Sequence, residues 1–324
     1  MLAIFTNETA GALAATGTAF CWALAALFFT SAARRIGQFS LNQIRLLMAI
    51  VLLSAACAIA GVFVQVPLSQ VSLLALSGVA GLTLGDAAYF FALQTIGPRR
   101  GALVLSLHPM FTALLGVLLL GEGLTWIGVA GMVVTLAGVA WVVAERSAPG
   151  ELHGSLWLGV LGGVGGAVGQ AVGAILAKAG LGYAPGSVLE QMSGLDAASR
   201  VEVHAFLGTL IRMISGFVPL MLFALVLGAV PRTFEKVRDG KAMAACLGGS
   251  VFGPFVGVSL SLYALTRVDS YVAATIFATA PVLVIPLVWA VYKERVSWRA
   301  VLGALVACAG VGMLTLREQI ARVL

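Results

Sequence analysis

The chain has 324 residues, of which 60% are hydrophobic and 10% are charged, whereas a soluble domain has roughly 45–50% apolar and about 25% charged residues. This composition excludes a disordered chain, a collagen, a disulfide scaffold and a cytosolic enzyme. The net charge of +6 does not indicate a nucleic-acid partner, because Lys and Arg stand in short gaps between apolar runs. The cysteines stand singly without a CxxC motif, so we expect neither a disulfide nor a metal site.

The apolar runs predict ten membrane-spanning helices. A bilayer crossing takes about 20 consecutive apolar residues, and these runs are too long and too continuous for the strands of a barrel. The first 27 residues contain no Lys or Arg, so we expect a retained first helix rather than a cleaved signal peptide. The predicted spans are 9–30, 41–64, 69–94, 99–120, 124–144, 154–179, 204–230, 242–266, 270–292 and 297–317.

The second half of the chain repeats the first. Gly81 and Pro109 recur as Gly253 and Pro281, in each case 172 positions later. Each copy holds five spans, and because five is odd the second copy must enter the membrane from the opposite side. We therefore predict an all-α membrane protein of ten transmembrane helices in two inverted five-helix repeats, an architecture typical of secondary transporters. An old duplication that serves only structure is the alternative.

The repeat divides the chain into residues 1–148 and 149–324, with an inserted polar loop at about 181–204. The fifth and tenth predicted spans, 124–144 and 297–317, carry no proline and no Asp, Glu, Lys, Arg or His away from their ends. We expect these two helices to be peripheral and the other eight to build a central cavity.

Stripes of small residues, spaced four apart, predict close contact between helices, since backbone approach supplies much of the packing energy in lipid. Pro109 and Pro281 stand at matched places inside spans, where we expect kinks or hinges that border the cavity; accommodation of shape is the alternative. No G-x-x-x-x-G-K-[ST] motif occurs, so neither transport powered by this chain's own ATPase nor an ATPase subunit is implied. The stripes are Ser77, Gly81 and Gly85; Gly165, Gly169 and Gly173; and Gly249, Gly253 and Gly257.

Asp86 is the acidic residue deepest in a span, and an ionisable group there is costly and indicates a functional site. It is a candidate for binding a cation or carrying a proton; a structural, hydrogen-bonded Asp is the alternative. Tyr89 lies on the same helical face, and Gly85 belongs to a packing stripe, so Asp86 should lie where the packed interface meets the cavity. His108, expected nine or ten residues into its helix, titrates near neutral pH and is the nearest expected titrating partner; a core histidine is the alternative.

Arg45 and Arg212 are repeat mates inside two further spans. Their side chains either snorkel to the membrane surface or face the cavity and attract an anionic substrate. Glu122 and Glu294 close their helices, and we interpret them as structural loop charges. Weaker candidates for lining the cavity by hydrogen bonds and aromatic contacts are Gln170, Trp22, Tyr263 and Thr275.

Two segments carry a family resemblance, and part of each recurs in the second copy. Residues 85–100, which begin Gly-Asp-Ala-Ala-Tyr, and residues 107–122, which begin Leu-His-Pro-Met-Phe and end Leu-Leu-Gly-Glu, resemble EamA-type transporters of the drug/metabolite transporter superfamily. The resemblance extends over about residues 11–317. It implies ten helices in two inverted repeats, a central cavity, and transport of small metabolites across the cell (inner) membrane.

We therefore expect a multi-pass secondary transporter that moves a small organic metabolite, by export, through alternating access. Its partners would be the small-molecule substrate and the lipid bilayer; a homodimer is compatible with the sequence, and no nucleic acid, metal or cofactor is expected. The alternatives are an intramembrane enzyme, which is disfavoured because the G-x-G-D and G-x-S-G protease motifs are absent, and a non-transporting assembly subunit. The distribution of Lys and Arg favours termini outside the cell, whereas the resemblance implies cytoplasmic termini.

Overall fold

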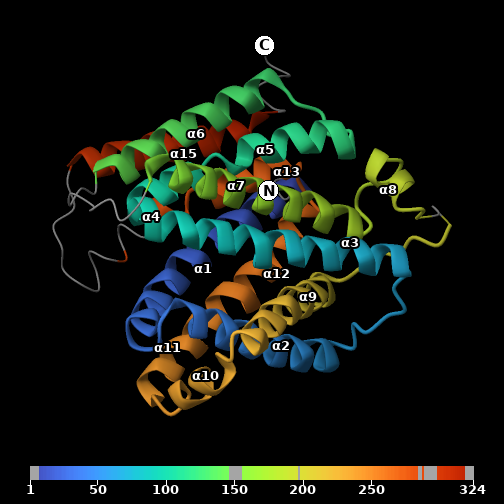
Figure 1. Ribbon diagram of the computed structural model, residues 1–324. Coiled ribbons are helices and arrows are strands. Elements are labelled where there is room, and N and C mark those ends of the chain that lie inside the picture. Colours follow the sequence, from blue (N-terminus) through green and yellow to red (C-terminus); the bar gives the residue numbers. More distant parts are fainter. Residues whose placement is uncertain (1–6, 146–154, 196–197, 284–286, 288–297, 318–324) are drawn as a thin grey trace.

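The computed structural model describes residues 7–145, 155–195, 198–283, 287 and 298–317, and in this part of the chain every regular element is helical (Figure 1). The elements are α1 (Asn7–Ile36), α2 (Gln38–Ala60), α3 (Leu68–Gly78), η2 (Val79–Gly85), α4 (Asp86–Leu105), α5 (His108–Leu115), η3 (Gly116–Leu120), α6 (Trp126–Glu145), α7 (Leu156–Gly180), α8 (Val188–Met192), α9 (Ala205–Val226), α10 (Val230–Lys236), α11 (Gly240–Ser250), η4 (Val251–Gly257), α12 (Val258–Leu265), α13 (Ser270–Phe277) and α15 (Trp298–Thr315).

Seven helices among the described residues are long and apolar enough to cross a membrane. Several are built from consecutive elements: α3, η2 and the first part of α4 form one span, and α11, η4 and α12 form another. Three shorter apolar helices, Trp126–Val142, Ser270–Leu283 and Val301–Thr315, lie at the remaining three predicted spans. The chain is therefore a multi-pass, all-helical membrane protein in the part that the structure describes.

The helix ends follow local backbone chemistry. Gly61 (φ 62°) ends α2 in the left-handed conformation, and its N–H donates to the carbonyl of Ala58, a conformation that favours glycine. Gly97 (φ 82°) interrupts α4 and so turns the chain from one span to the next.

Two widened π-helical segments, η2 and η4, occupy matched places in the two halves, residues 79–85 and 251–257. Such segments are rare and often lie at functional sites. In η4, Pro254 removes one backbone donor inside the helix. The two segments give each half a local irregularity near the middle of a span.

The predicted span over 99–120 is present as Arg100–Leu120, but a turn at Ser106–Leu107 divides it between α4 and α5. His108 therefore begins a helix rather than lying nine or ten residues inside one. Pro109 stands in the first turn of α5, where its missing N–H has no intrahelical partner to lose. The matched turn at residues 278–279 precedes Pro281 in the second half. Glu294 lies outside the described residues.

The small-residue stripes of α3–η2 and α7 face each other. A Cβ added at Gly169 would lie 2.6 Å from the Cα of Gly85, and one added at Gly173 would lie 3.3 Å from the Cα of Gly81. The hydroxyl of Ser77 donates to the carbonyl of Gly173 at 2.5 Å. The predicted close helix contact is present at this seam.

The stripe in α11 and η4 packs against α1 instead. Cβ atoms added at Gly249 and Gly253 would meet the Phe29 ring, and one at Gly257 would lie 2.7 Å from the Trp22 indole. Here the glycines make room for aromatic rings rather than for another glycine backbone.

Helices α6 and α15 pack on each other along one edge of the molecule, at the top of Figure 1. Their contact is also built from glycines, since a Cβ at Gly138 would lie 2.7 Å from the carbonyl oxygen of Gly303 and one at Gly310 would lie 2.7 Å from that of Gly131. The two helices sit at the periphery, as expected from their lack of prolines and of ionisable groups away from their ends.

A buried ion pair joins three segments at one end of the bundle. Glu122, which follows η3, accepts from the Lys178 Nζ at 2.8 Å, and both side chains are nearly buried (7% and 10% exposed). Glu122 also accepts from the backbone N–H (2.8 Å) and hydroxyl (2.7 Å) of Ser270. The Lys178 ammonium further donates to the carbonyl of Val268 at 2.8 Å. Glu122 is thus a structural charge.

Candidate functional site

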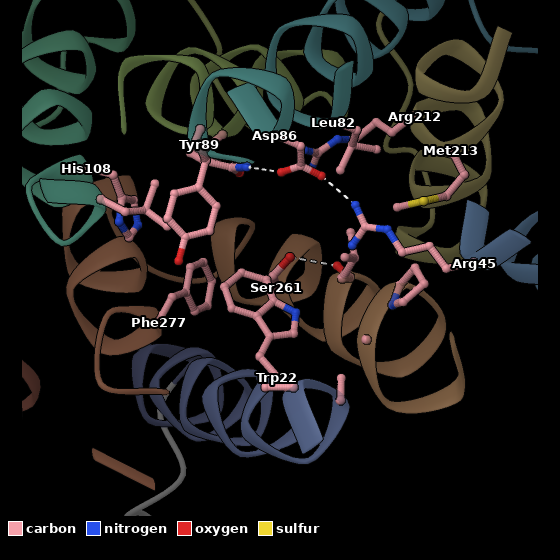
Figure 2. Close-up of a pocket in the computed structure, with 18 of the residues that line it drawn as sticks. Trp22, Arg45, Leu82, Asp86, Tyr89, His108, Arg212, Met213, Ser261 and Phe277 are labelled. Atoms are coloured by element: carbon pink, nitrogen blue, oxygen red, sulfur yellow. Dashed lines mark hydrogen bonds and ion pairs between the residues drawn. The ribbon is translucent and has the colours of Figure 1, made fainter. Parts of the chain in front are cut away.

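A cavity of about 330 Å³ lies among the helices (Figure 2), within the size range of ligand pockets, roughly 300–1,000 Å³. Ten elements contribute to its wall, and among the described residues none of the lining comes from α6 or α15. The lining residues are Trp22, Ala25, Ala26, Phe29, Arg45, Leu46, Leu82, Asp86, Tyr89, Leu105, His108, Gln170, Ala174, Arg212, Met213, Gly253, Pro254, Val258, Ser261, Leu265, Ala274 and Phe277.

Asp86 is the central residue on the polar side of the cavity, because Arg45 and Gln170 both bind its carboxylate. It begins α4 directly after η2, next to the seam where Gly85 meets α7. Its carboxylate accepts from the Arg45 guanidinium at 2.5 Å and from the Gln170 amide at 2.9 Å. The Asp86 side chain is 13% exposed, so these bonds take the place of water around the charge. Asp86 therefore lies where the packed seam meets the cavity, as expected, but its partners are Arg45 and Gln170 rather than His108.

Arg45 is held on three sides. Its Nε donates to the Asn42 side-chain oxygen at 2.6 Å, one turn earlier in α2. Its guanidinium lies 5.7 Å from the centre of the Phe29 ring, within the range of a cation–π contact. Arg45 thus faces the cavity and does not snorkel to the membrane surface.

Arg212 also lines the cavity, and it is buried (6% exposed). Its Nε has no hydrogen-bond partner, although the guanidinium is close enough to Asp86 for an electrostatic interaction. Figure 2 shows its side chain ending beside Asp86, on the same side of the cavity as Arg45. Two arginines therefore approach one carboxylate, and Arg212 is the less satisfied of the two.

The opposite side of the cavity is aromatic and apolar. The rings of Trp22 and Phe277 lie 5.3 Å apart at 56°, and Figure 2 places both across the cavity from Arg212. Tyr89 and His108 line the wall between them and the polar side. A ligand in this cavity would meet a charged surface at one end and aromatic rings at the other.

Seven of the nine predicted binding or coupling residues lie together in this cavity: Asp86, Tyr89, His108, Arg45, Arg212, Gln170 and Trp22. Two do not. Tyr263 is 38% exposed and lies under the Arg267 guanidinium, and the hydroxyl of buried Thr275 donates to the Tyr271 carbonyl one turn earlier in α13. Neither Pro109 nor Pro281 lines the cavity, although His108 does.

Sequence reasoning missed several lining residues. Met213 and Phe277 are apolar residues in apolar helices, so no local signal distinguishes them from lipid-facing or core positions. Ser261 could have been found, and so could Asn42, which does not line the cavity but binds Arg45, because polar groups in a span are expected to have a partner in protein. Asn42 precedes Arg45 by three positions, the spacing of neighbours on one helix face.

Comparisons with known proteins agree with this architecture. The model of the EamA-like transporter family matches residues 9–144 and 196–316, which is most of the chain. A solved crystal structure aligns over 95% of this chain and 98% of that chain with a TM-score of 0.70 at 19% sequence identity, a likeness that shows the fold alone. No curated protein matches the chain significantly. The chain belongs to the EamA-like transporter family and is consistent with the drug/metabolite transporter superfamily.

Proposed function

We propose that the protein is a secondary transporter that moves a small organic metabolite through the cavity around Asp86. The observation that supports this most is a cavity in a multi-pass helical bundle whose wall carries Asp86, Arg45 and Arg212. Ionisable groups are costly inside a membrane and are kept there for substrate or ion pathways. The family membership points to transport of the same general kind.

We further propose ten transmembrane helices in two inverted repeats, residues 1–148 and 149–324. Matched irregularities support this: η2 and η4 are separated by 172 positions, as are the turns before Pro109 and Pro281. Matched packing supports it too. Helix α7, the first of the second repeat, packs on α3, η2 and α4, while α1, the first of the first repeat, packs on α11, η4 and α12. The swap of partners is what a two-fold axis between the repeats would produce.

Alternating access would arise from rocking of the two repeats around the cavity. We propose that the two turns that precede Pro109 and Pro281 act as hinges. The helical hydrogen bonds are interrupted at these turns, so the chain bends there at low cost. We propose that the protein exports its substrate across the inner membrane.

Two other functions are weaker. An intramembrane hydrolase would need a nucleophile or a second acid beside Asp86, but its partners in the cavity are Arg45 and Gln170. A non-transporting assembly subunit has no need of a cavity lined by three charged side chains. A homodimer is compatible with the proposed transporter and with a non-transporting subunit.

The test begins with a comparison of metabolites in the medium of cells with and without the gene. Candidates that depend on the gene are then measured for flux in liposomes that contain the purified full-length protein. Asp86→Asn should fold and insert but reduce flux by about tenfold or more, because Arg45 loses its ionic partner at the cavity wall. The matched control is Glu235→Gln, which removes a carboxylate on exposed α10, outside the cavity, and should leave flux unchanged.

Gene-dependent candidates that show no protein-dependent flux in liposomes would contradict transport by this chain. Unchanged flux of Asp86→Asn, between pH 5 and 8, would contradict the role of Asp86 while leaving transport itself in place.

A further inference from the structure

The charges on the cavity wall do not balance. Arg45 and Arg212 contribute two guanidinium cations, whereas Asp86 is the sole carboxylate among the lining residues. Asp86 is already engaged by Arg45 at 2.5 Å and by Gln170. A ligand that enters the cavity therefore meets a surplus of one positive charge.

The surplus is located at Arg212. This side chain is 6% exposed, it lines the cavity, and its Nε lacks a hydrogen-bond partner. Leaving a buried donor of a charged group without a partner is costly. An arginine guanidinium presents its donors in a planar fork that matches the two oxygens of a carboxylate. An anionic group beside Arg212 would thus neutralise the guanidinium charge that Asp86, already paired with Arg45, leaves uncompensated.

The rest of the cavity selects the body of the ligand. Trp22 and Phe277 lie across the cavity from Arg212, with their rings 5.3 Å apart, and Leu265 adds apolar surface to the wall. A ligand whose charge is at one end and whose apolar or aromatic group is at the other fits this polarity.

We propose that the cavity binds a small organic monoanion, with its carboxylate on Arg212 and its apolar or aromatic body against Trp22 and Phe277. This inference rests on the proposed function, because it names the substrate class of the same site. A single negative charge on the ligand neutralises the surplus, which a neutral or cationic ligand of the same shape leaves in place.

The test is equilibrium binding to the purified full-length protein in lipid nanodiscs, with three probes of nearly identical shape. These are 3-phenylpropionate, its neutral amide 3-phenylpropanamide, and the cation 3-phenylpropylamine. We expect the carboxylate to bind at least about tenfold more tightly than the amide, as a charge-assisted pair in a desolvated site gives, and the amine to bind most weakly. Equal affinities, absence of binding of all three, or a preference for the amine would overturn the proposal.

Arg212→Gln should abolish the preference for the carboxylate over the amide, and Arg212→Lys should retain part of it, since the charge stays while the planar fork is lost. The control is Arg232→Gln on exposed α10, which should keep the full preference. A preference that survives in Arg212→Gln would overturn the assignment to Arg212. The probe series on the unmodified protein remains decisive if the variant does not fold.

Binding is measured without flux, so the two proposals fail separately. Protein that prefers the carboxylate but moves no solute in liposomes would contradict transport and leave the binding site in place. Protein that moves a solute but shows no preference for the carboxylate would contradict the substrate class alone.

Discussion

Removing the carboxylate of Glu122 should destabilise the protein more than removing its partner's charge. Glu122→Gln leaves the ammonium of Lys178 nearly buried and without a countercharge, because the carbonyl of Val268 and the oxygen of the new amide are both neutral acceptors. Lys178→Met leaves Glu122 with the backbone N–H and the hydroxyl of Ser270 as donors. The carboxylate is therefore better satisfied alone than the ammonium is.

The magnitudes follow from this difference. Breaking a buried pair so that one charge stays uncompensated costs about 3–5 kcal/mol, which we expect for Glu122→Gln. Lys178→Met should cost about 1–3 kcal/mol, because two hydrogen bonds still stabilise the remaining charge. The double variant should be more stable than the sum of the single losses implies, with an interaction energy of about 1–3 kcal/mol.

The assay is reversible unfolding in mixed micelles, in which the free energy of unfolding is measured as the fraction of denaturing detergent rises. The control is Arg35→Gln, which removes a more exposed ion pair with Asp239 (44% and 29% exposed) and should cost less than about 1 kcal/mol. The reasoning would be refuted if Lys178→Met cost as much as Glu122→Gln, or if the effects of the two changes simply added.

Three further predictions concern packing, charge and pH. Gly138→Ala on α6 should lower the free energy of unfolding by about 1–3 kcal/mol, because its methyl group would lie 2.7 Å from the Gly303 carbonyl oxygen. The control is Gly312→Ala on the partner helix α15, where the added methyl group would meet open space, and an equal loss in both variants would refute the close contact. Asp86→Asn should tighten binding of 3-phenylpropionate even as it slows transport, because it raises the surplus of positive charge, and weaker binding in a nanodisc titration would contradict this. The pKa of the Asp239 carboxyl is lowered mainly by the hydrogen bond from Arg35 and next by the hydrogen bond from the backbone N–H of Ala242. Asp239 therefore stabilises the folded protein at pH values above its unfolded pKa of about 3.9. This stabilisation is lost as the pH falls toward the lower pKa of the folded state. Asp239→Asn should reduce the fall in the free energy of unfolding at acid pH, and an unchanged fall would show that Asp239 does not cause it.

Periodic features of the sequence predicted the local architecture well. Apolar runs marked the helices because a bilayer requires long apolar segments, and the stripe of Gly81 and Gly85 marked a seam because close backbone approach needs small residues. The cost of burying charge predicted Asp86 at the cavity, since such groups avoid lipid, whereas the sequence left Arg45 and Arg212 open between the cavity and the membrane surface.

Other features depend on contacts that a single sequence does not encode locally. Tyr263 and Thr275 have the polar character of cavity residues, but exposure and a local hydrogen bond account for them. The break at Ser106–Leu107 was missed because Pro109 was interpreted as an interior kink rather than as part of a first helical turn. The partner of Asp86 was missed because pairing with Arg45 joins residues 41 positions apart, on helices whose register the sequence leaves open.

The central claim is that the cavity lies on the path of the substrate and opens alternately to the two sides of the membrane. Its most direct test is a cysteine at Ala174, which lines the cavity on α7, in protein whose four native cysteines have been replaced. A membrane-impermeant thiol reagent is applied to liposomes from one side or the other, with the protein held in a single orientation, and flux of the identified substrate is measured after labelling. We predict that the reagent reaches the cysteine from either side, that substrate slows the labelling, and that complete labelling stops flux. Labelling from one side alone, or flux that persists after complete labelling, would contradict the account.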